Sequence, residues 1–380
     1  MARYYAPLMA LTALSLMACT QEPAALPETD APQVDVEDVV PIDPSIVSPT
    51  DDLYLTWQLQ SLQRCQDGYG EFKEAVLTLA IDTDSFLNEP SAAGLAQTQS
   101  SWQLAAEKWG MADLCSHRPL ATDSATNFAA RYQRTVAAPA LPGYLDSIPD
   151  YADTGIVNDN TVTLSLESLE VQHQISFEEE VALGLYAVEV LLFGVEPRSA
   201  DDFIMTTEEG ASTTRRAGLL RLITNDLLTQ AEIWQDNWPA RISNVRRTYS
   251  TTYQLTWLID NWILALEKVE RASARVLNGE PGLALHPMHD HVRFKGTLAA
   301  LHDWMAQPDT LRIVETFELP MNEWQSTVEQ TATWLETHTV DTETTSDLTA
   351  LQPINSAAIQ HLRIFREVTE NTWHTLANSN

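Results

Sequence analysis

The chain has 380 residues, of which 44% are hydrophobic and 20% charged, and it contains 13 glycines. These proportions exclude a disordered chain, a collagen-like chain and a small disulfide framework, and the length suffices for a large buried core in one or two domains. The 53 acidic residues outnumber the 22 basic ones, which gives a formal net charge of -31. We therefore expect no nucleic-acid partner, since phosphate binding needs clustered cations, and anionic lipid headgroups would repel this surface.

The first 18 residues have the composition of an export signal. Arg3 is their only charge, and the apolar run that ends at Ala18 is too short to span a bilayer as a helix. The tetrad Leu-Met-Ala-Cys that ends at Cys19 resembles the bacterial lipobox, whose cysteine is lipidated; the alternative is an ordinary signal peptide with an incidental cysteine. Thr20, in place of Asp, resembles the sequence that permits outer-membrane placement. The predicted localisation is export and lipid anchoring in the cell envelope, at the outer membrane facing the periplasm.

The segment after the predicted signal and the two other cysteines are interpreted for an exported protein. Residues 19–50 are rich in proline and acid and contain no aromatic residue, which predicts an extended, disordered tether before a folded part that begins near Asp51. In an oxidising compartment, Cys65 and Cys115 are expected to form a disulfide. Metal ligation by this pair is the weaker alternative, because neither cysteine lies in a CxxC motif.

Apolar residues after Asp51 recur mostly at helical spacing. The pattern predicts a helix that ends near Gly68 and Gly70, a second helix directly after them, and another over residues 91–114. Residues 137–160, broken by three prolines and two glycines, form the longest irregular stretch. Ser176 and Glu179 have capping-box spacing and predict a helix over residues 176–193. Further helices are predicted over residues 214–237, 253–277, 296–305, 321–338 and 355–376.

Strand signals are scarce, since the alternating run at residues 161–166 is short and isolated. The sequence shows no internal repeat of fixed period and no second apolar span long enough for a membrane. The predicted fold class is therefore all-α, built from long antiparallel helices in bundles.

An acidic residue stands in the middle of an apolar helical segment that runs from Gly184 to Gly194. Burial of an unpaired carboxylate is costly, so Glu189 must be protonated, paired or bound to a cation. Tyr186 lies three residues earlier and hence on the same helix face.

This segment resembles the signature of the imelysin family, Gly-x-His-x-x-Glu followed by an apolar run and a glycine. Gly184 and Glu189 match the signature, and Tyr186 stands where the family has histidine. The resemblance covers about residues 51–380. It includes segment 145–155, which is similar to the proline-containing loop before the signature helix, and segment 286–304, which resembles the opening of a later helix.

A further part of the resemblance lies upstream, where Trp102, Trp109 and Asp113 are similar to a family pattern that usually ends in Glu. The resemblance implies an imelysin-like fold of two antiparallel helical bundles packed together, over residues 51–200 and 201–380. It also implies that the signature helix lines a cleft between them.

Family membership implies an exported or lipid-anchored protein linked to iron acquisition or ligand binding. Some relatives carry a peptidase label, but zinc peptidases need two histidines, a carboxylate and an open water position. Position 186 is Tyr, and the chain contains no HExxH motif. The sequence therefore favours a binding protein over an enzyme.

If the signature site binds a metal, its predicted ligands are Glu189, Tyr186 and Asp113, and the predicted ion is iron or another divalent cation. Phenol and carboxylates form an all-oxygen set that could suit Fe(III), but the phenol must first lose a proton with a pKa near 10. In the alternative, Tyr186 donates a hydrogen bond to Glu189 or Asp113 and the site holds no metal. The sequence leaves both alternatives open.

Other chemistry-bearing residues give weaker signals. His286, His289 and His291 have an HxxHxH spacing that can bind a metal, although a polar turn before a helix is the favoured interpretation. His117 could reach Asp113. The chain has no GxSxG motif, no Cys/His nucleophile motif and no glycine-rich phosphate loop.

The sequence thus predicts a lipid-anchored, non-enzymatic binding protein, most simply one that binds a metal such as iron or takes part in its uptake. The first alternative is an interaction module whose degenerate site binds an envelope protein partner. A metallopeptidase is the least favoured alternative.

Overall fold

The computed structural model describes residues 49–120, 123–208, 210–248, 251–338 and 344–378, all within one compact unit. Their regular structure is helical apart from one isolated β-bridge between Ile148 and Tyr151, which confirms the all-α prediction. None of the described helices combines the length and the apolar character that a membrane span requires. The predicted export signal, the predicted lipidation residue Cys19 and the predicted tether lie outside the described residues.

The helices differ widely in length, from four residues to 40. In chain order the elements are α1 (Pro49–Asn88), α2 (Ala92–Asp113), α3 (Ala125–Val136), α4 (Pro142–Leu145), α5 (Leu166–Gln172), α6 (Leu185–Phe193), the 3-10 helix η1 (Ala200–Phe203), α7 (Ser212–Thr248), α8 (Thr251–Leu277), α9 (Pro287–Met305), α10 (Pro308–Thr316), α11 (Met321–Thr337) and α12 (Thr344–Asn378).

The predicted break at Gly68 and Gly70 is wrong, because α1 continues through both glycines. A Cβ on Gly68 would lie 3.4 Å from the Cα of Ala112, an ordinary van der Waals contact, so sterics do not require glycine there. Packing of α1 along α2 and α7 stabilises the helix through both glycines, whereas the sequence pattern alone suggested a helix end.

The predicted helix over residues 176–193 is also wrong in its first half, since α6 begins only at Leu185. Glu180, rather than Glu179, closes a tight turn by accepting hydrogen bonds from the backbone N–H groups of Ser176 (2.7 Å) and Phe177 (3.2 Å). A carboxylate four residues after the serine therefore satisfies a turn that resembles a helix start in sequence.

The remaining predicted helices correspond to observed ones. The helices predicted from residues 214, 253, 296, 321 and 355 correspond to α7, α8, α9, α11 and α12, although α7, α9 and α12 extend beyond the predicted limits. Residues 161–166 form no strand, and α5 begins at Leu166. Residues 137–160 are irregular apart from α4, as expected, whereas the sequence analysis missed α3 and α10.

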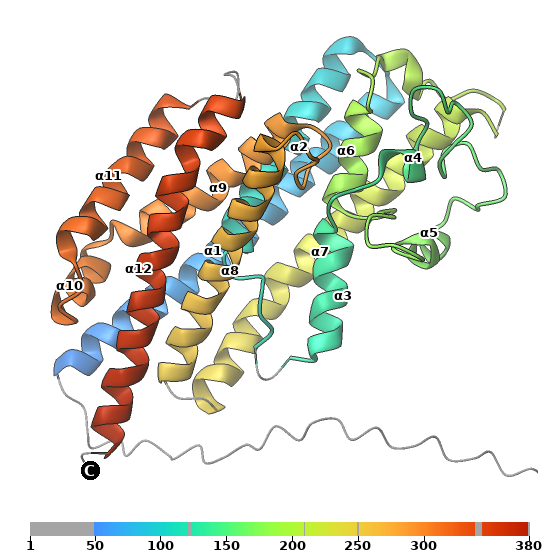
Figure 1. Cartoon of the computed structure of the whole chain (residues 1–380). Helices are drawn as coiled ribbons and strands as arrows, with labels where there is room; N and C mark the ends of the chain where they lie inside the picture. Colours follow the sequence, from blue (N-terminus) through green and yellow to red (C-terminus); the bar gives the residue numbers. More distant parts are fainter. Residues whose placement is uncertain (1–48, 121–122, 209, 249–250, 339–343, 379–380) are drawn as a thin grey trace, which may run out of the picture. The chain divides into compact units, whose positions relative to one another are not determined.

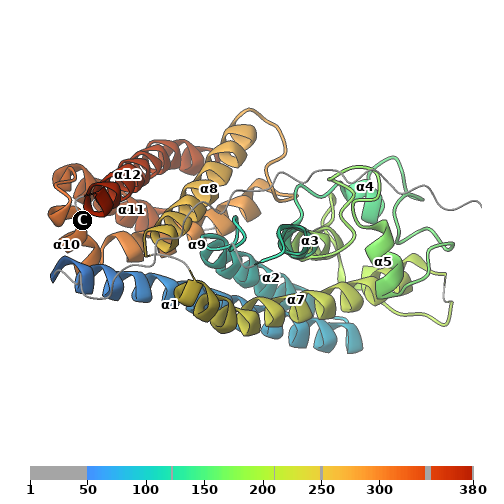
Figure 2. The same cartoon turned by 90° about the horizontal axis from the view of Figure 1, so that it is seen from below.

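Long helices from both halves of the chain pack against one another. α1 contacts α2 and α7, α2 also contacts α9, and α8 contacts α12 (Figure 1). The view from below shows α8 beside α12 and α1 beside α7 (Figure 2). The division into bundles at residues 51–200 and 201–380 stays a prediction.

α2 and α9 cross with their backbones in direct contact. A Cβ on Gly110 would lie 2.2 Å from the carbonyl oxygen of Arg293, and a Cβ on Gly296 would lie 1.9 Å from that of Glu107. Only glycine allows so close an approach. The crossing holds Arg293 directly against the C-terminal half of α2.

Candidate functional site

The signature helix α6 is almost entirely enclosed. Every residue from Leu185 to Leu192 is buried, and α6 packs against α2, α3, α4 and α7. Gly184 precedes the helix with φ +89°, and a Cβ there would lie 2.6 Å from the carbonyl oxygens of both Arg134 and Thr135. The glycine of the signature therefore has a steric role, because it lets α6 start against the backbone of α3.

Glu189 is fully buried and its carboxylate is satisfied by N–H groups. The backbone N–H of Leu285 donates to both oxygens at 3.0 Å, and that of His286 donates to Oε1 at 3.3 Å. The Nδ1 atom of His289 lies 2.5 Å from the same Oε1. Glu189 thus joins the turn before α9 to the signature helix. Of the three states expected for this carboxylate, protonated, paired or bound to a cation, the structure shows the paired one.

A second cluster joins the other two predicted site residues through Arg293. Its Nη1 donates to the Tyr186 hydroxyl at 2.7 Å, and its Nη2 donates to Asp113 Oδ2 at 2.5 Å. The Tyr132 hydroxyl donates to Asp113 Oδ1 at 3.0 Å, and Lys268 Nζ donates to the Tyr132 oxygen at 2.6 Å. The chain therefore places a cation of its own between Tyr186 and Asp113, all three of them at 2% exposure.

His117 extends this cluster, since its Nε2 lies 3.2 Å from Asp113 Oδ2, as its place in the sequence suggested. Burial alone would raise the pKa of Asp113, but the charges of Arg293, His117 and Lys268 outweigh it and hold that pKa well below its usual range. Asp113 is thus a buried anion balanced by neighbouring cations.

Burial shifts the pKa values of the Tyr186 phenol and the Lys268 amine, each toward its neutral form. Burial raises the pKa of Tyr186 although the nearby Arg293 charge opposes the rise, so this phenol keeps its proton at neutral pH. Burial and the Arg293 charge lower the pKa of Lys268 to about 7. Lys268 therefore titrates near neutral pH in the folded chain.

Asp290 forms a third acidic position beside the same turn. Its Oδ1 accepts hydrogen bonds from the backbone N–H groups of Leu283 (3.0 Å) and Ala284 (3.1 Å). Burial, which outweighs these hydrogen bonds, raises the pKa of Asp290 to about 7, and the Glu189 charge adds to the rise. Asp290 and Glu189 thus hold successive backbone amides of one turn without sharing a ligand position.

The three clustered histidines face different surroundings. His286 Nε2 lies 2.9 Å from the carbonyl oxygen of Gly194, and His289 contacts Glu189. His291 points toward Asp347, at 3.8 Å, and its ring stacks on Trp334. In the described ranges, no group of three or more His, Cys, Asp and Glu side chains is placed to hold a metal ion.

The sequence analysis missed Arg293, Lys268 and Tyr132. One signal was available for Arg293, because it follows His289 by four residues and so lies on the same face of α9. Lys268 and Tyr132 lie on α8 and α3, and nothing in their local sequence links them to Asp113.

Comparison with known proteins supports the resemblance. The imelysin family model, which carries the peptidase M75 label, matches residues 65–285, more than half of the chain. No curated protein matches the chain.

Two solved structures share the fold. An imelysin-like protein from Psychrobacter arcticum 273-4 is similar with a TM-score of 0.58 and 14% identity, over 87% of this chain and 95% of that one. A candidate iron-regulated protein A precursor from Parabacteroides distasonis ATCC 8503 is similar with a TM-score of 0.52 and 12% identity, over 86% of this chain and 97% of that one. At these identities the likeness concerns the fold alone.

Proposed function

Because the chain belongs to the imelysin family, we propose that it is a non-enzymatic binding protein of the cell envelope with a role related to iron uptake. The link to iron is supported by the fold that it shares with the candidate iron-regulated protein from Parabacteroides distasonis. The predicted export signal and the lipobox-like tetrad support an anchor at Cys19, and Thr20 supports placement at the outer membrane.

The position of Arg293 carries the proposal for the signature site. A metal ion bound by Tyr186 and Asp113 would lie beside a fixed guanidinium, and the two positive charges would repel each other in a buried environment. Metal ligation would also require Tyr186 to lose a proton, although burial raises its pKa.

Glu189, the third predicted ligand, does not fit a metal centre either. Its two oxygens already accept hydrogen bonds from Leu285 and His286 and contact His289. We therefore propose that the signature has become a structural ion cluster in this chain. These contacts also leave no open position on the three residues for the metal-bound water of a peptidase.

Metal titration tests this proposal. The purified chain, its Glu189→Gln variant and the matched Glu74→Gln control, whose exposed carboxylate lies on α1, would be titrated with Fe(II) and Fe(III) and analysed for bound metal. We expect no stoichiometric iron binding that depends on Glu189, so the three proteins should behave alike. One equivalent bound by the wild type and by Glu74→Gln, but not by Glu189→Gln, would sink the proposal and restore a metal site at the signature.

The anchor is tested separately. A Cys19→Ser variant should fail to incorporate labelled fatty acid and should leave the membrane fraction. Unchanged incorporation in that variant would show that the tetrad ending at Cys19 is not a lipidation site.

A further inference from the structure

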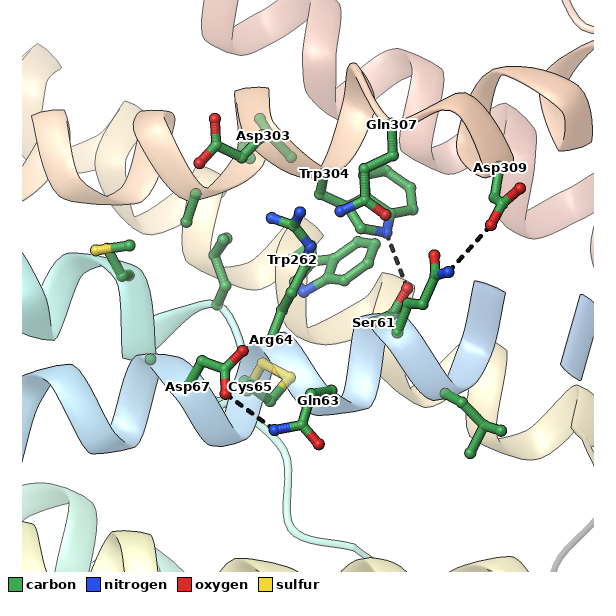
Figure 3. A pocket seen from close by; sticks show the side chains of 18 of the residues that line it. Ser61, Gln63, Arg64, Cys65, Asp67, Trp262, Asp303, Trp304, Gln307 and Asp309 are labelled. Carbon is green, nitrogen blue, oxygen red and sulfur yellow. Dashed lines mark hydrogen bonds between the residues drawn. A yellow bond between two sulfur atoms is a disulfide. The ribbon is translucent and has the colours of Figure 1, made fainter. Parts of the chain in front are cut away.

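A cavity of about 890 Å³ opens between α1, the end of α2, α8 and the α9–α10 segment (Figure 3). No residue of the signature helix lines it. Its size falls within the range of small-molecule sites, about 300–1,000 Å³. The cavity therefore has room for a ligand at a place distinct from the signature.

The base of this cavity is apolar. The Cys65–Cys115 disulfide, which joins α1 to the residues just beyond α2, contributes to the lining. Trp262 and Trp304 pack edge to face with ring centroids 4.0 Å apart, and both rings line the cavity. Such a base suits the apolar or planar body of a small organic molecule.

Arg64, an exposed residue of α1, contributes a positive charge to the lining of the cavity. Its side chain rises from α1 toward α9 in Figure 3. The amide oxygen of Gln307, in the orientation that satisfies both groups, accepts from Arg64 Nε and Nη2. Within the described ranges Arg64 forms no ion pair, so its Nη1 side is free to receive an acceptor group.

The Trp262 indole provides a second donor. Trp262 is only 4% exposed, and its Nε1 makes no hydrogen bond to any described residue. Its neighbour Trp304, by contrast, donates to Ser61 Oγ at 3.0 Å. A nearly buried N–H group that faces a cavity without a protein acceptor indicates a position for a ligand oxygen.

Acidic side chains at the rim are largely held by neighbours. Glu71 accepts from Lys108 at 2.8 Å. The three aspartates also have neighbours: Asp67 accepts a hydrogen bond from Gln63 at 2.9 Å, Asp309 accepts one from Gln60 at 3.1 Å, and Asp303 lies 3.3 Å from His302 Nδ1. These acids would repel a multiply charged anion, whereas a single carboxylate could reach Arg64 between them.

We propose that this cavity binds a small, partly apolar organic molecule through its carboxylate, with Arg64 and the Trp262 N–H as the carboxylate donors. The acidic rim favours a zwitterion, such as an amino acid or a short peptide, whose amine faces the rim while its apolar part lies on the tryptophan base. This inference rests on the proposed binding function and gives it a ligand class and a site.

Calorimetric titration of the full-length chain with leucyl-leucine tests the inference, and leucyl-leucinamide is the matched probe without a carboxylate. We expect leucyl-leucine to bind and the amide to bind at least about tenfold more weakly, because hydrogen bonds to charged groups contribute roughly one to two powers of ten in affinity. Arg64→Gln should weaken binding of the free acid about two- to fivefold, because solvent screens the charge of an exposed arginine. Trp262→Phe, which removes the donor together with part of the indole that packs on Trp304, should weaken it at least about fivefold.

The control is Arg271→Gln, whose exposed guanidinium lies on α8 outside the cavity and should leave binding unchanged. Failure of leucyl-leucine to bind at millimolar concentration would overturn the inference, as would equal binding of the amide or no effect of Arg64→Gln. Stoichiometric iron binding at Glu189 would instead overturn the proposal for the signature site, so the two failures are distinguishable.

Discussion

Replacement of Arg293 by methionine should destabilise the fold severely, by about 3–5 kcal/mol, which is the usual cost of leaving a buried charge without its partner. Arg293 and Asp113 are each 2% exposed, so water cannot replace the lost ion pair. Methionine roughly fills the volume of the arginine stem, which keeps a cavity from dominating the result. The Tyr132 hydroxyl and His117 would remain as the partners of Asp113.

The double variant Arg293→Met/Asp113→Asn separates charge from packing. Because removal of both partners of a buried pair is often close to neutral, we expect it to recover most of the stability lost by the single variant. Arg271→Met, at an exposed position of α8, is the control and should change stability by less than about 0.5 kcal/mol.

Urea unfolding at pH 7 measures these differences, and a pH series adds a check of sign. The pKa of Asp113 is depressed in the folded chain, so its contribution to stability is present above its unfolded pKa, about 3.9, and is lost as the pH falls through the folded value. A loss below about 1 kcal/mol for Arg293→Met, or a double variant no more stable than the single one, would show that the Arg293–Asp113 pair does not stabilise the fold.

Three further predictions concern packing, the disulfide and a titrating amine. Gly296→Ala should destabilise the fold by about 1–3 kcal/mol or more in urea unfolding, because its Cβ would lie 1.9 Å from a backbone oxygen of α2. The control Gly70→Ala would meet only the end of one side chain and should be tolerated. Equal effects of the two variants would show that the α2–α9 crossing does not require glycine. Reduction of the disulfide, which closes a 50-residue separation, should lower stability by about 4 kcal/mol, and an unchanged urea midpoint in reductant would contradict this. The pKa of Lys268 is about 7 in the folded chain and about 10.4 in the unfolded chain. Between these pH values the amine is protonated in the unfolded chain and neutral in the folded one. The free energy of unfolding should therefore rise with pH over this range. Lys268→Met should flatten this rise in unfolding measurements at several pH values, and a variant with the wild-type slope would show that burial does not shift this amine.

Local patterns in the sequence were enough to predict the helical fold and the need for a partner at Glu189. The apolar spacing after residue 51 marked most long helices, since a stripe at helical period reflects burial of one face. An acid within the apolar run at Glu189 could only be protonated, paired or bound to a cation, and the structure shows it paired.

Contacts between residues far apart in the sequence determine the helix boundaries that were mispredicted and the cation at the signature site. The glycine pair in α1 resembled a helix end, because the packing of α1 along α2 and α7 that keeps it helical leaves no local trace in the sequence. The capping-box spacing at Ser176 failed because Glu180 one residue later closes a competing turn. Arg293 reaches Asp113 only through the crossing of α2 and α9, so the sequence could not place a cation at the signature site.

The most direct test of the central claim is the visible absorption spectrum of the purified chain after Fe(III) is added. A phenolate bound to Fe(III) gives a charge-transfer band in the visible region, and such a bond would require Tyr186 to lose its proton and its contact with Arg293. We expect no visible band attributable to Tyr186, because Arg293 occupies the position between that phenol and Asp113. A band that appears with one equivalent of Fe(III) and disappears in Tyr186→Phe would contradict this expectation.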